Sequence, residues 1–179
     1  MELNDRTDYQ RCFACGLQNP SGLQMRFFQE GDAIVSDFQP REEHQGFPGV
    51  LHGGIIAALF DEALNRTSLL AEHPAWTMTA RLEVRYRRYV PYGPLLRVKA
   101  WLDRQRGRMI QAHGALVLAE DEEVIFAEAK GSFMSLQPEA LDALMKDYPG
   151  MRAFLEASTH SSQSKEGELS HDLPQEASG

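Results

Sequence analysis

One acidic residue and one pair of glycines are spaced so that they could act together on a carbonyl group. The segment that begins at His44 ends in His52-Gly53-Gly54, and Asp61 follows Gly54 by seven residues. If a helix begins at the glycines, their backbone N–H groups lack intrahelical acceptors and lie at the positive end of the helix dipole. Glycine lets another molecule approach those donors closely, which suits a carbonyl oxygen that becomes an oxyanion during acyl transfer.

Asp61 is an acidic residue in an apolar stretch that includes Leu59 and Phe60. A buried carboxylate costs free energy unless it has a partner or is used in chemistry. Taken alone, this pattern favours a structural carboxylate, because paired acids also occupy protein cores. The neighbouring acid Glu62 is four residues before Arg66, a spacing that predicts an ion pair on a helix surface. We therefore interpret Glu62 as structural.

The spacing along the helix separates the glycines from the acid. Gly53 and Asp61 are eight residues apart, which is about 12 Å along a helix axis at the usual rise per residue. One carbonyl carbon cannot lie within hydrogen-bonding reach of both groups. If both act on one substrate, they must come from different subunits, and a homodimer then carries two equivalent sites across its two-fold interface.

One long helix, predicted over residues 52–70, must position these groups. Its first three turns have no polar stripe, and a helix that is apolar all round must be buried all round. Long alternating strands are the elements available to cover it. We therefore expect an α+β fold in which a curved antiparallel sheet wraps the central helix. A second subunit is expected to cover the part of the helix that the sheet leaves open.

Alternation of apolar and polar residues predicts the strands that form this sheet. A hairpin of residues 22–29 and 33–39, turned at Gly31-Asp32, is expected first, and residues 41–50 read as loop because of Pro48 and two glycines. Four strands are then expected at residues 77–89, 95–103, 108–118 and 123–133. A short C-terminal helix is predicted from Pro138 to Asp147.

Three segments resemble those of one enzyme family. The sequence PGVLHGGIIAALFDEA at residues 48–63 is similar to the signature of hotdog-fold thioesterases, in the branch that includes phenylacetate-pathway and THEM-type acyl-CoA thioesterases. The sequence LEVRYRRYVPYG at residues 82–93 resembles the next motif of that branch, and CFACGLQNPSGL at residues 12–23 resembles the leader of many bacterial members. The resemblance covers most of residues 12–135. It implies the hotdog fold, hydrolysis of an acyl-coenzyme A to free acid and coenzyme A, and a homodimer or a dimer of dimers.

The resemblance also implies roles for residues at the helix start and in the helix. Asp61 would be the general base or the nucleophile, two routes that the sequence does not separate. The Gly53 amide would polarise the thioester carbonyl, with Gly54 beside it in the substrate site. His52 would shape the helix start and the site, and from the residues alone it could equally serve only to order the helix start.

Two further positions are compared with the family. Thr79 falls where relatives have a Ser or Thr that helps to orient the attacking water, although strict alternation places it on the strand face opposite Leu82 and Val84. Some relatives carry Asn at the position of Gly46, and the adjacent Gln45 is a candidate to replace it in the substrate site.

The arginines form two local basic clusters in an acidic chain. One consists of Arg85, Arg87 and Arg88, and the other of Arg104, Arg106 and Arg108. Because a guanidinium group binds phosphate in bidentate fashion, the first cluster is a candidate to hold the phosphates of coenzyme A. The alternative is that each arginine forms an ordinary ion pair at a strand edge.

The chain has two cysteines, Cys12 and Cys15, so no disulfide framework is expected to support the fold. Their spacing is that of a zinc knuckle, but two thiolates supply half of a tetrahedral site. The histidines His44, His73 and His113 lack ligand spacing. We expect a turn without metal, and a redox pair stays open as the alternative. Neither a metal ion nor a cofactor is expected.

Composition bounds the remaining properties of the chain. A net charge of −8 argues against nucleic acid or an anionic membrane as a partner. The sequence has no apolar run long enough for a membrane helix and no secretory signal at its start, so a cytoplasmic protein is expected. Residues 1–10 are expected to be a flexible leader, residues 11–157 one domain including the C-terminal helix, and residues 158–179 a disordered tail rich in Ser, Glu and Gly.

Two other functions compete with the thioesterase interpretation. A non-catalytic acyl-CoA-binding sensor would use the same groove, but the sequence contains no recognisable output domain. A hotdog hydratase or dehydratase would pair an acid with a catalytic histidine in a different local motif, which this sequence lacks. The identity of the acyl group is not predicted, because it depends on the walls of the pocket.

Overall fold

A computed structural model describes residues 11–72 and 76–148 of the chain. These residues fall into two compact units, one that ends at Gln137 and one that begins at Pro138, and each unit is described by itself. The predicted leader at residues 1–10, the predicted domain end at residue 157 and the predicted tail at residues 158–179 lie outside the described residues.

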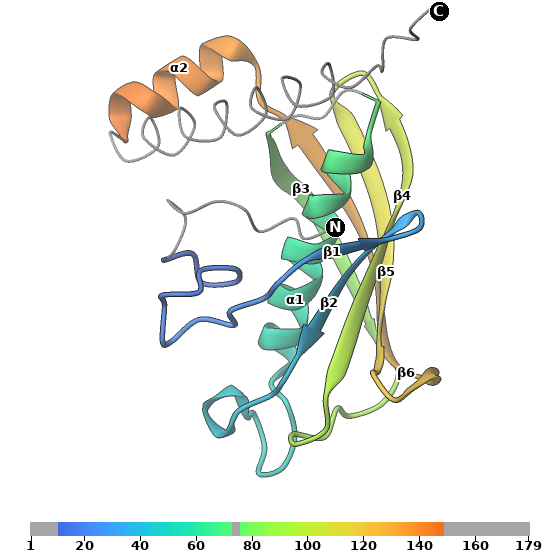
Figure 1. Cartoon of the computed structure of the whole chain (residues 1–179). Coiled ribbons are helices and arrows are strands. Elements are labelled where there is room, and N and C mark those ends of the chain that lie inside the picture. The colour runs from blue at the N-terminus through green and yellow to red at the C-terminus, as the bar shows by residue number, and fades with distance from the viewer. Residues whose placement is uncertain (1–10, 73–75, 149–179) are drawn as a thin grey trace, which may run out of the picture. The chain divides into compact units, whose positions relative to one another are not determined.

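The first unit contains one long helix and a six-stranded sheet (Figure 1). All neighbouring strands are antiparallel, in the order β1-β2-β4-β5-β6-β3, so β1 and β3 form the two edges. The strands are β1 (Phe28–Glu30), β2 (Ala33–Phe38), β3 (Thr77–Tyr86), β4 (Leu96–Arg106), β5 (Met109–Leu118) and β6 (Asp121–Ser135). The helix is α1 (Gly53–Arg66), which continues as a 3-10 turn over Thr67–Leu70.

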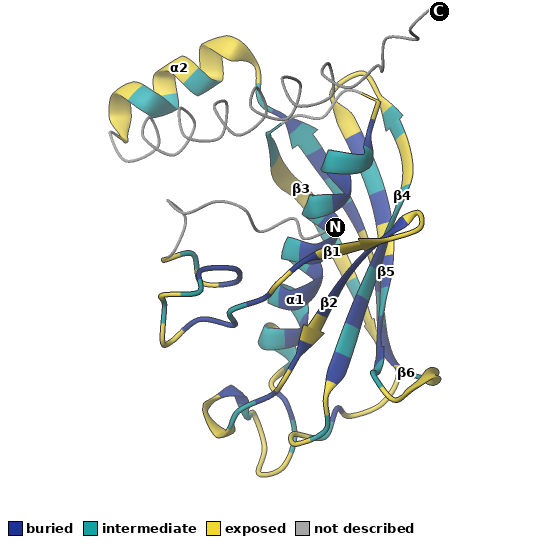
Figure 2. Cartoon of the chain, viewed as in Figure 1, coloured by how far each residue is buried: buried dark blue, intermediate teal, exposed yellow. Residues whose placement is uncertain are grey.

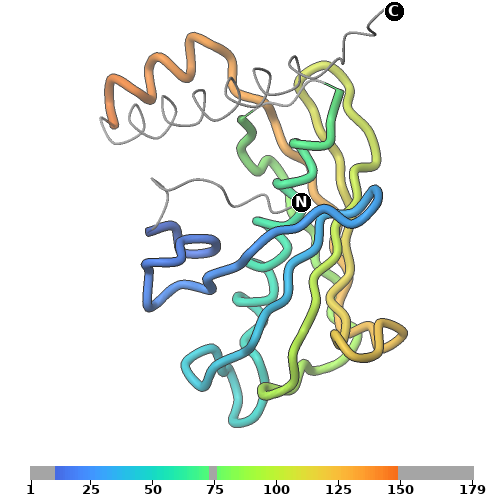
Figure 3. The backbone as a smooth tube through the Cα atoms, viewed as in Figure 1, coloured from blue at the N-terminus to red at the C-terminus, as the bar shows by residue number. Residues whose placement is uncertain are grey.

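The sheet curves around α1, which lies across one of its faces (Figures 1 and 3). α1 packs against β2, β3, β4, β5 and β6. The predicted α+β architecture, a central helix wrapped by a curved antiparallel sheet, is therefore confirmed. The predicted positions of the last four strands agree with the structure to within three residues at each end.

The burial of α1 differs between its faces (Figure 2). The side chains of Ile56, Leu59, Phe60, Ala63 and Leu64 are buried against the sheet. Three further apolar side chains of the same helix are only half-buried, namely Ile55, Ala57 and Ala58. Within one chain the sheet thus covers one side of an apolar helix and leaves another side partly open to solvent.

The first predicted strand was wrong in its extent. Residues 22–27 were expected to pair in the hairpin, but β1 begins only at Phe28. The backbone N–H groups of Leu23 and Met25 instead donate to the carbonyl oxygens of Phe13 and Ala14, and Gln24 has a positive φ of 53°. The segment therefore packs against the turn that contains the two cysteines. The hairpin turn at Gly31 and Asp32 is confirmed, with Gly31 at a φ of 62°.

A β-bulge changes the face on which Thr79 lies. Thr79 pairs with Phe133 of β6, and the next paired residue of β3 is Arg81, opposite Ser132. The extra residue reverses the alternation, so Thr79 lies on the same face as Leu82, which is opposite Gly131. The prediction from strict alternation, which put these residues on opposite faces, is therefore wrong.

The second unit contains α2 (Pro138–Asp147), with the bounds predicted from the sequence. Proline suits the first position of a helix, because its φ is already helical and its missing N–H would have no acceptor there. α2 has no buried residue. Within residues 11–72 and 76–148, no helix has the length and apolarity needed to cross a membrane.

Candidate active site

The start of α1 is fixed by a histidine cap. His52 is the N-cap residue, and its ring atom Nδ1 accepts a hydrogen bond of 2.9 Å from the Gly54 N–H. The next free donors of the helix, on Ile55 and Ile56, donate to the His52 carbonyl oxygen. The Gly53 N–H has no hydrogen-bond acceptor among the residues that the structure describes. Of the two glycine amides, that of Gly53 is therefore the one available to a ligand.

Tyr86, at the end of β3, also contacts the first turn of α1. Its hydroxyl donates to the Gly53 carbonyl oxygen at 2.8 Å. A Cβ atom added at Gly53 would lie 3.5 Å from the Tyr86 ring, an ordinary contact, whereas one at Gly54 would lie 3.0 Å from the His52 ring. Close packing therefore disfavours a side chain more strongly at the position of Gly54 than at that of Gly53.

A cavity of about 920 Å³ opens beside this helix start. Apolar and aromatic side chains together form most of its wall, and Phe47 and Tyr89 are 78% and 81% exposed there. The residues that line it include Phe47, His52, Gly53, Tyr86, Tyr89 and Phe126. The unpaired Gly53 N–H therefore belongs to the wall of a cavity large enough for an acyl group and part of a carrier.

The loop before α1 uses its polar side chains to hold itself together. The amide group of Gln45 donates to the Glu42 carbonyl oxygen and accepts from the Gly49 N–H. His44 is buried, its Nδ1 accepts from the Arg41 N–H, and its carbonyl oxygen accepts from the His52 N–H. Burial lowers the pKa of His44. Gln45, predicted to contact substrate, is thus already satisfied within the loop.

Asp61 lies two turns further along α1, half-buried and facing β3. The Thr79 hydroxyl donates to its carboxylate at 2.7 Å, which brings together two residues predicted for the site. Burial raises the pKa of Asp61, the Thr79 hydrogen bond lowers it, and the charge of Glu62 raises it again, with a net rise. A carboxylate with a raised pKa and a neighbouring hydroxyl is suited to accept a proton from water.

The donor and the acid are separate within one chain. Asp61 does not line the cavity that contains Gly53. β3 runs antiparallel to α1, and hydrogen bonds join it to α1 at Tyr86–Gly53, Thr79–Asp61 and Thr77–Asn65. The two reactive groups are thus held at opposite ends of the same strand, which agrees with the separation calculated from the helix rise.

The three arginines predicted to bind phosphate do not lie together, because two of them line the cavity and the third does not. Arg87 and Arg88 line the cavity, and both of their backbone N–H groups donate to the Phe126 carbonyl oxygen. The Arg87 side chain forms an ion pair with Glu128. Arg85 lies on the face of β3 opposite Tyr86 and does not line the cavity.

The acid next to Asp61 has a different environment. Glu62 accepts from Arg66 at 2.8 Å, as the spacing predicted. The structure adds two partners that the sequence did not indicate, because Cys12 and Cys15 lie beside this pair. One atom of each of Cys12, Cys15 and Glu62 lies within 4.8 Å of the others.

Sequence reasoning missed the part that Tyr86 plays. Tyr86 lies within the strand predicted at residues 77–89 and within the motif at residues 82–93, but no role in the site was predicted for it. The sequence does give one indication of this role, because Tyr86 lies near the end of that strand, shortly before Val90 and Pro91, which line the cavity. This position predicts a role for Tyr86 in the site only once the end of the strand is known to contact the start of the helix.

Comparison with known structures defines the class of fold. The crystal structure of zebra fish Thioesterase Superfamily Member 2 superposes with a TM-score of 0.60 at 16% identity, covering 68% of this chain and 92% of that one. The structure of smu.793 from Streptococcus mutans, bound to acetyl CoA, superposes with a TM-score of 0.55 at 13% identity, covering 63% and 88% of the two chains. The sheet wrapped around α1 is therefore the hotdog fold, as predicted.

Sequence comparison defines the family. The sequence model of the thioesterase superfamily matches residues 48–125, which include α1 and β3 to β5. Acyl-coenzyme A thioesterase THEM4 from Bos taurus is 31% identical over 137 residues, which are 75% of this chain and 55% of that protein. The chain thus spans about half the length of that relative. Residues 48–125 are therefore similar in sequence to the thioesterase superfamily.

Proposed function

We propose that this chain hydrolyses an acyl-CoA thioester at a reaction centre built by two subunits. The observation that carries the proposal is the Gly53 N–H, a donor without an acceptor among the described residues, in the wall of an aromatic cavity. The reaction class is supported by the family match and by relatives named acyl-coenzyme A thioesterase. A hotdog protein bound to acetyl CoA supports the choice of carrier.

In this proposal the thioester carbonyl oxygen accepts a hydrogen bond from Gly53 of one subunit. That donor stabilises the negative charge that develops as the tetrahedral intermediate forms. Asp61 of the second subunit takes a proton from the attacking water, or attacks the carbonyl carbon to form an anhydride that water then hydrolyses. The carbon–sulfur bond breaks, and the products are the free acid and the thiol of coenzyme A.

Thr79 and His52 position the reacting groups in this scheme. Thr79 donates to one carboxylate oxygen of Asp61, which leaves the other oxygen to accept a proton from water. His52 holds the Gly54 N–H and so orients the first turn of α1 with the Gly53 N–H unpaired. We therefore assign Gly54 to the framework of the site and Gly53 to the contact with substrate.

A homodimer is supported by two surfaces that one chain leaves open. The side of α1 that carries Ile55, Ala57 and Ala58 is only half-buried, and β3 is an edge strand of the described sheet. Two β3 edges that paired antiparallel about Leu82 would place Arg81 opposite Glu83 of the second subunit. The same pairing would bring the Thr79 end of one strand to the Tyr86 end of the other, where Gly53 lies.

The carrier is proposed to enter beside Arg87 and Arg88. These two arginines share a wall of the cavity with Tyr89, and Arg88 is the better candidate for phosphate because Arg87 is paired with Glu128. Arg85 and Gln45 were also predicted from the sequence to bind substrate, but neither is given a substrate contact in this proposal. Arg85 lies on the other face of β3, and the Gln45 side chain is hydrogen-bonded within its own loop. Assembly as a dimer of dimers and a cytoplasmic location stay predictions from the sequence.

Turnover of a panel of acyl-CoA substrates by wild type and Asp61→Asn tests the proposal. The panel should include short aliphatic, long aliphatic and aromatic acyl groups, with loss of thioester absorbance as the readout. Asp61→Asn should lower turnover by about 10²- to 10⁴-fold, because the amide cannot accept the proton from water. Glu62→Gln is the matched control, because it changes the neighbouring acid, and it should keep most of the activity.

Two outcomes would contradict the proposal. Equal rates in wild type and Asp61→Asn would remove Asp61 from the reaction. Tight binding of acyl-CoA by the wild type without any hydrolysis would instead favour the acyl-CoA-binding sensor. Single turnover in ¹⁸O-labelled water separates the two routes, because only an anhydride leaves label in the Asp61 carboxylate.

A further inference from the structure

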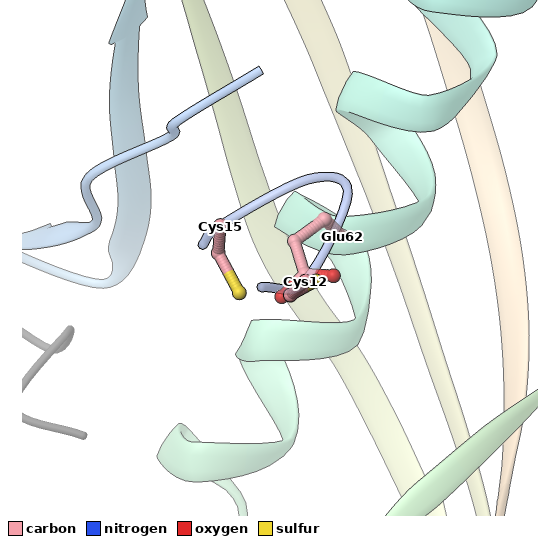
Figure 4. Close-up of side chains that lie close together, drawn as sticks. All are labelled: Cys12, Cys15 and Glu62. Atoms are coloured by element: carbon pink, nitrogen blue, oxygen red, sulfur yellow. The ribbon is translucent and has the colours of Figure 1, made fainter. Parts of the chain in front are cut away.

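Two cysteines lie together on a turn that the proposed function does not use. The Gly16 N–H donates to the Cys12 carbonyl oxygen at 3.0 Å, which closes the turn and brings the two side chains to one side. Both cysteines are free thiols, and their sulfur atoms lie within 4.8 Å of each other. Figure 4 shows both beside Glu62 of α1.

The two thiols differ in their access to solvent. Cys15 is buried, with 8% of its surface exposed, whereas Cys12 is only half-buried. A reagent in solution can therefore reach Cys12 first. This is the arrangement that a dithiol needs if one sulfur is to react with a small molecule and the other is to resolve the product.

A partly buried arginine, Arg66, supplies positive charge to the pair. Arg66 donates to the Cys15 sulfur at 3.2 Å and to Glu62 at 2.8 Å. Its guanidinium group lies over the Phe27 ring, 5.2 Å from the centroid, so it is held in place on a third side. Because this guanidinium group contacts the Cys15 sulfur, it stabilises the thiolate that Cys15 becomes when it attacks an oxidised Cys12.

A hydrogen bond between the two thiols shifts their pKa values in opposite directions. A hydrogen bond from the Cys15 thiol lowers the pKa of Cys12 to about 6, although burial raises it. The same hydrogen bond, together with burial, raises the pKa of Cys15. The lower pKa thus belongs to the more accessible sulfur, that of Cys12, and Cys15 is the buried thiol beside it.

We propose that Cys12 and Cys15 form a reactive dithiol that a hydroperoxide oxidises to a disulfide. The Cys12 thiolate attacks the terminal peroxide oxygen, the oxygen–oxygen bond breaks, and a sulfenic acid and an alcohol or water result. The Cys15 sulfur then attacks the Cys12 sulfur, and the hydroxyl group leaves as water. In total, two thiols and one hydroperoxide give one disulfide, one alcohol or water, and one water.

The position of Arg66 favours this chemistry over a metal site. Cys12, Cys15 and Glu62 could offer three ligand atoms to zinc. However, the guanidinium group of Arg66 already donates to Glu62 and to Cys15, which are two of those three groups. A divalent ion would have to displace this cation from both of them. The proposal does not depend on the thioesterase activity.

The experiment uses the reduced chain of 179 residues, which contains two cysteines. One equivalent of hydrogen peroxide should remove both titratable thiols and lower the intact mass by the two hydrogens lost. Peptide mapping should then place the disulfide between Cys12 and Cys15. In Cys15→Ala the oxidation should stop at the sulfenic acid of Cys12, which dimedone traps.

The rate of reaction with iodoacetamide tests the thiolate independently of oxidation. At pH 7, Cys12 should be alkylated about tenfold faster than glutathione, because more of it is thiolate even though a low pKa weakens the nucleophile. Cys15→Ala should slow this reaction, because Cys12 loses the hydrogen bond that lowers its pKa. Alkylation no faster than that of glutathione would overturn the proposal. Retention of one zinc ion per chain that blocks oxidation would also overturn it, in favour of a metal site.

Discussion

The two ends of the contact between α1 and β3 present opposite kinds of group to a reacting carbonyl. At the start of the helix the group is a backbone donor, the Gly53 N–H, beside a cavity. Two turns later it is a side-chain acceptor, Asp61, which lies outside that cavity and is held by Thr79. One end lacks an acid and the other lacks a donor, so each is half of a site for acyl transfer.

The difference also decides how each half can be changed. The donor is part of the backbone, so its direction is fixed by the helix cap at His52, and a side-chain substitution leaves it in place. The acid is tuned by its surroundings, because burial, Thr79 and Glu62 all act on its pKa. Substitutions at the two ends should therefore leave different kinetic signatures.

After Asp61→Asn, removal of the donor should have the largest effect. Gly53→Pro deletes the N–H at the first helical position, where proline is tolerated, and the extended backbone of His52 (ψ 134°) suits a following proline. Loss of one oxyanion donor lowers kcat by about 10²- to 10³-fold. Gly53→Ala keeps the N–H, and its Cβ would meet Tyr86 at an ordinary 3.5 Å. Steady-state kinetics should show a large loss for proline and a small one for alanine, and equal losses would remove the Gly53 N–H from the mechanism.

A charge reversal on β3 should weaken the proposed dimer. Arg81→Glu would oppose Glu83 of the second subunit, and it also removes the exposed ion pair that Arg81 forms with Glu83 of its own chain. Like charges in two symmetric cross-strand pairs should raise the dissociation constant by about tenfold. Sedimentation equilibrium measures this change, and Glu83→Arg in the same chain should restore the dimer. Unchanged association in the single variant would exclude this pairing of the β3 edges.

The smallest effect is expected from the loss of the Thr79 hydroxyl. Asp61 must be ionised to act, and its raised pKa places the acidic limb of the rate profile above that of an ordinary carboxyl group. Because Thr79 lowers this pKa, Thr79→Val should raise it further and move the limb to higher pH. The pH dependence of kcat shows the shift, and Thr79→Ser, which keeps the hydroxyl, should match the wild type. A shift to lower pH in Thr79→Val would contradict the role given to this hydrogen bond.

Periodic patterns in the sequence were sufficient to predict the framework of the site. The helix start at Gly53 and the ion pair of Glu62 with Arg66 depend on spacing within one helix, and both are confirmed. The β4 to β6 strands follow from alternation alone. These features could be predicted because each depends on contacts that repeat regularly along the chain.

Irregular and long-range features could not be predicted in this way. The bulge between Thr79 and Arg81 adds one residue to a strand whose period is otherwise two, so the predicted face of Thr79 was wrong. The contact of Tyr86 with Gly53 and that of Cys15 with Arg66 join segments far apart in sequence. No local pattern encodes such contacts, because they arise only when the sheet closes around α1.

Activity in mixed dimers tests most directly whether two subunits share each reaction centre. Asp61→Asn and Gly53→Pro chains, each inactive alone, should be unfolded together, refolded and assayed at equal concentrations. Random assortment makes half of the dimers mixed, and each mixed dimer has one site with an intact Gly53 and an intact Asp61. The mixture should therefore recover about a quarter of the wild-type activity. If mass measurement shows mixed dimers but the activity stays at the level of the separate variants, the shared site is contradicted.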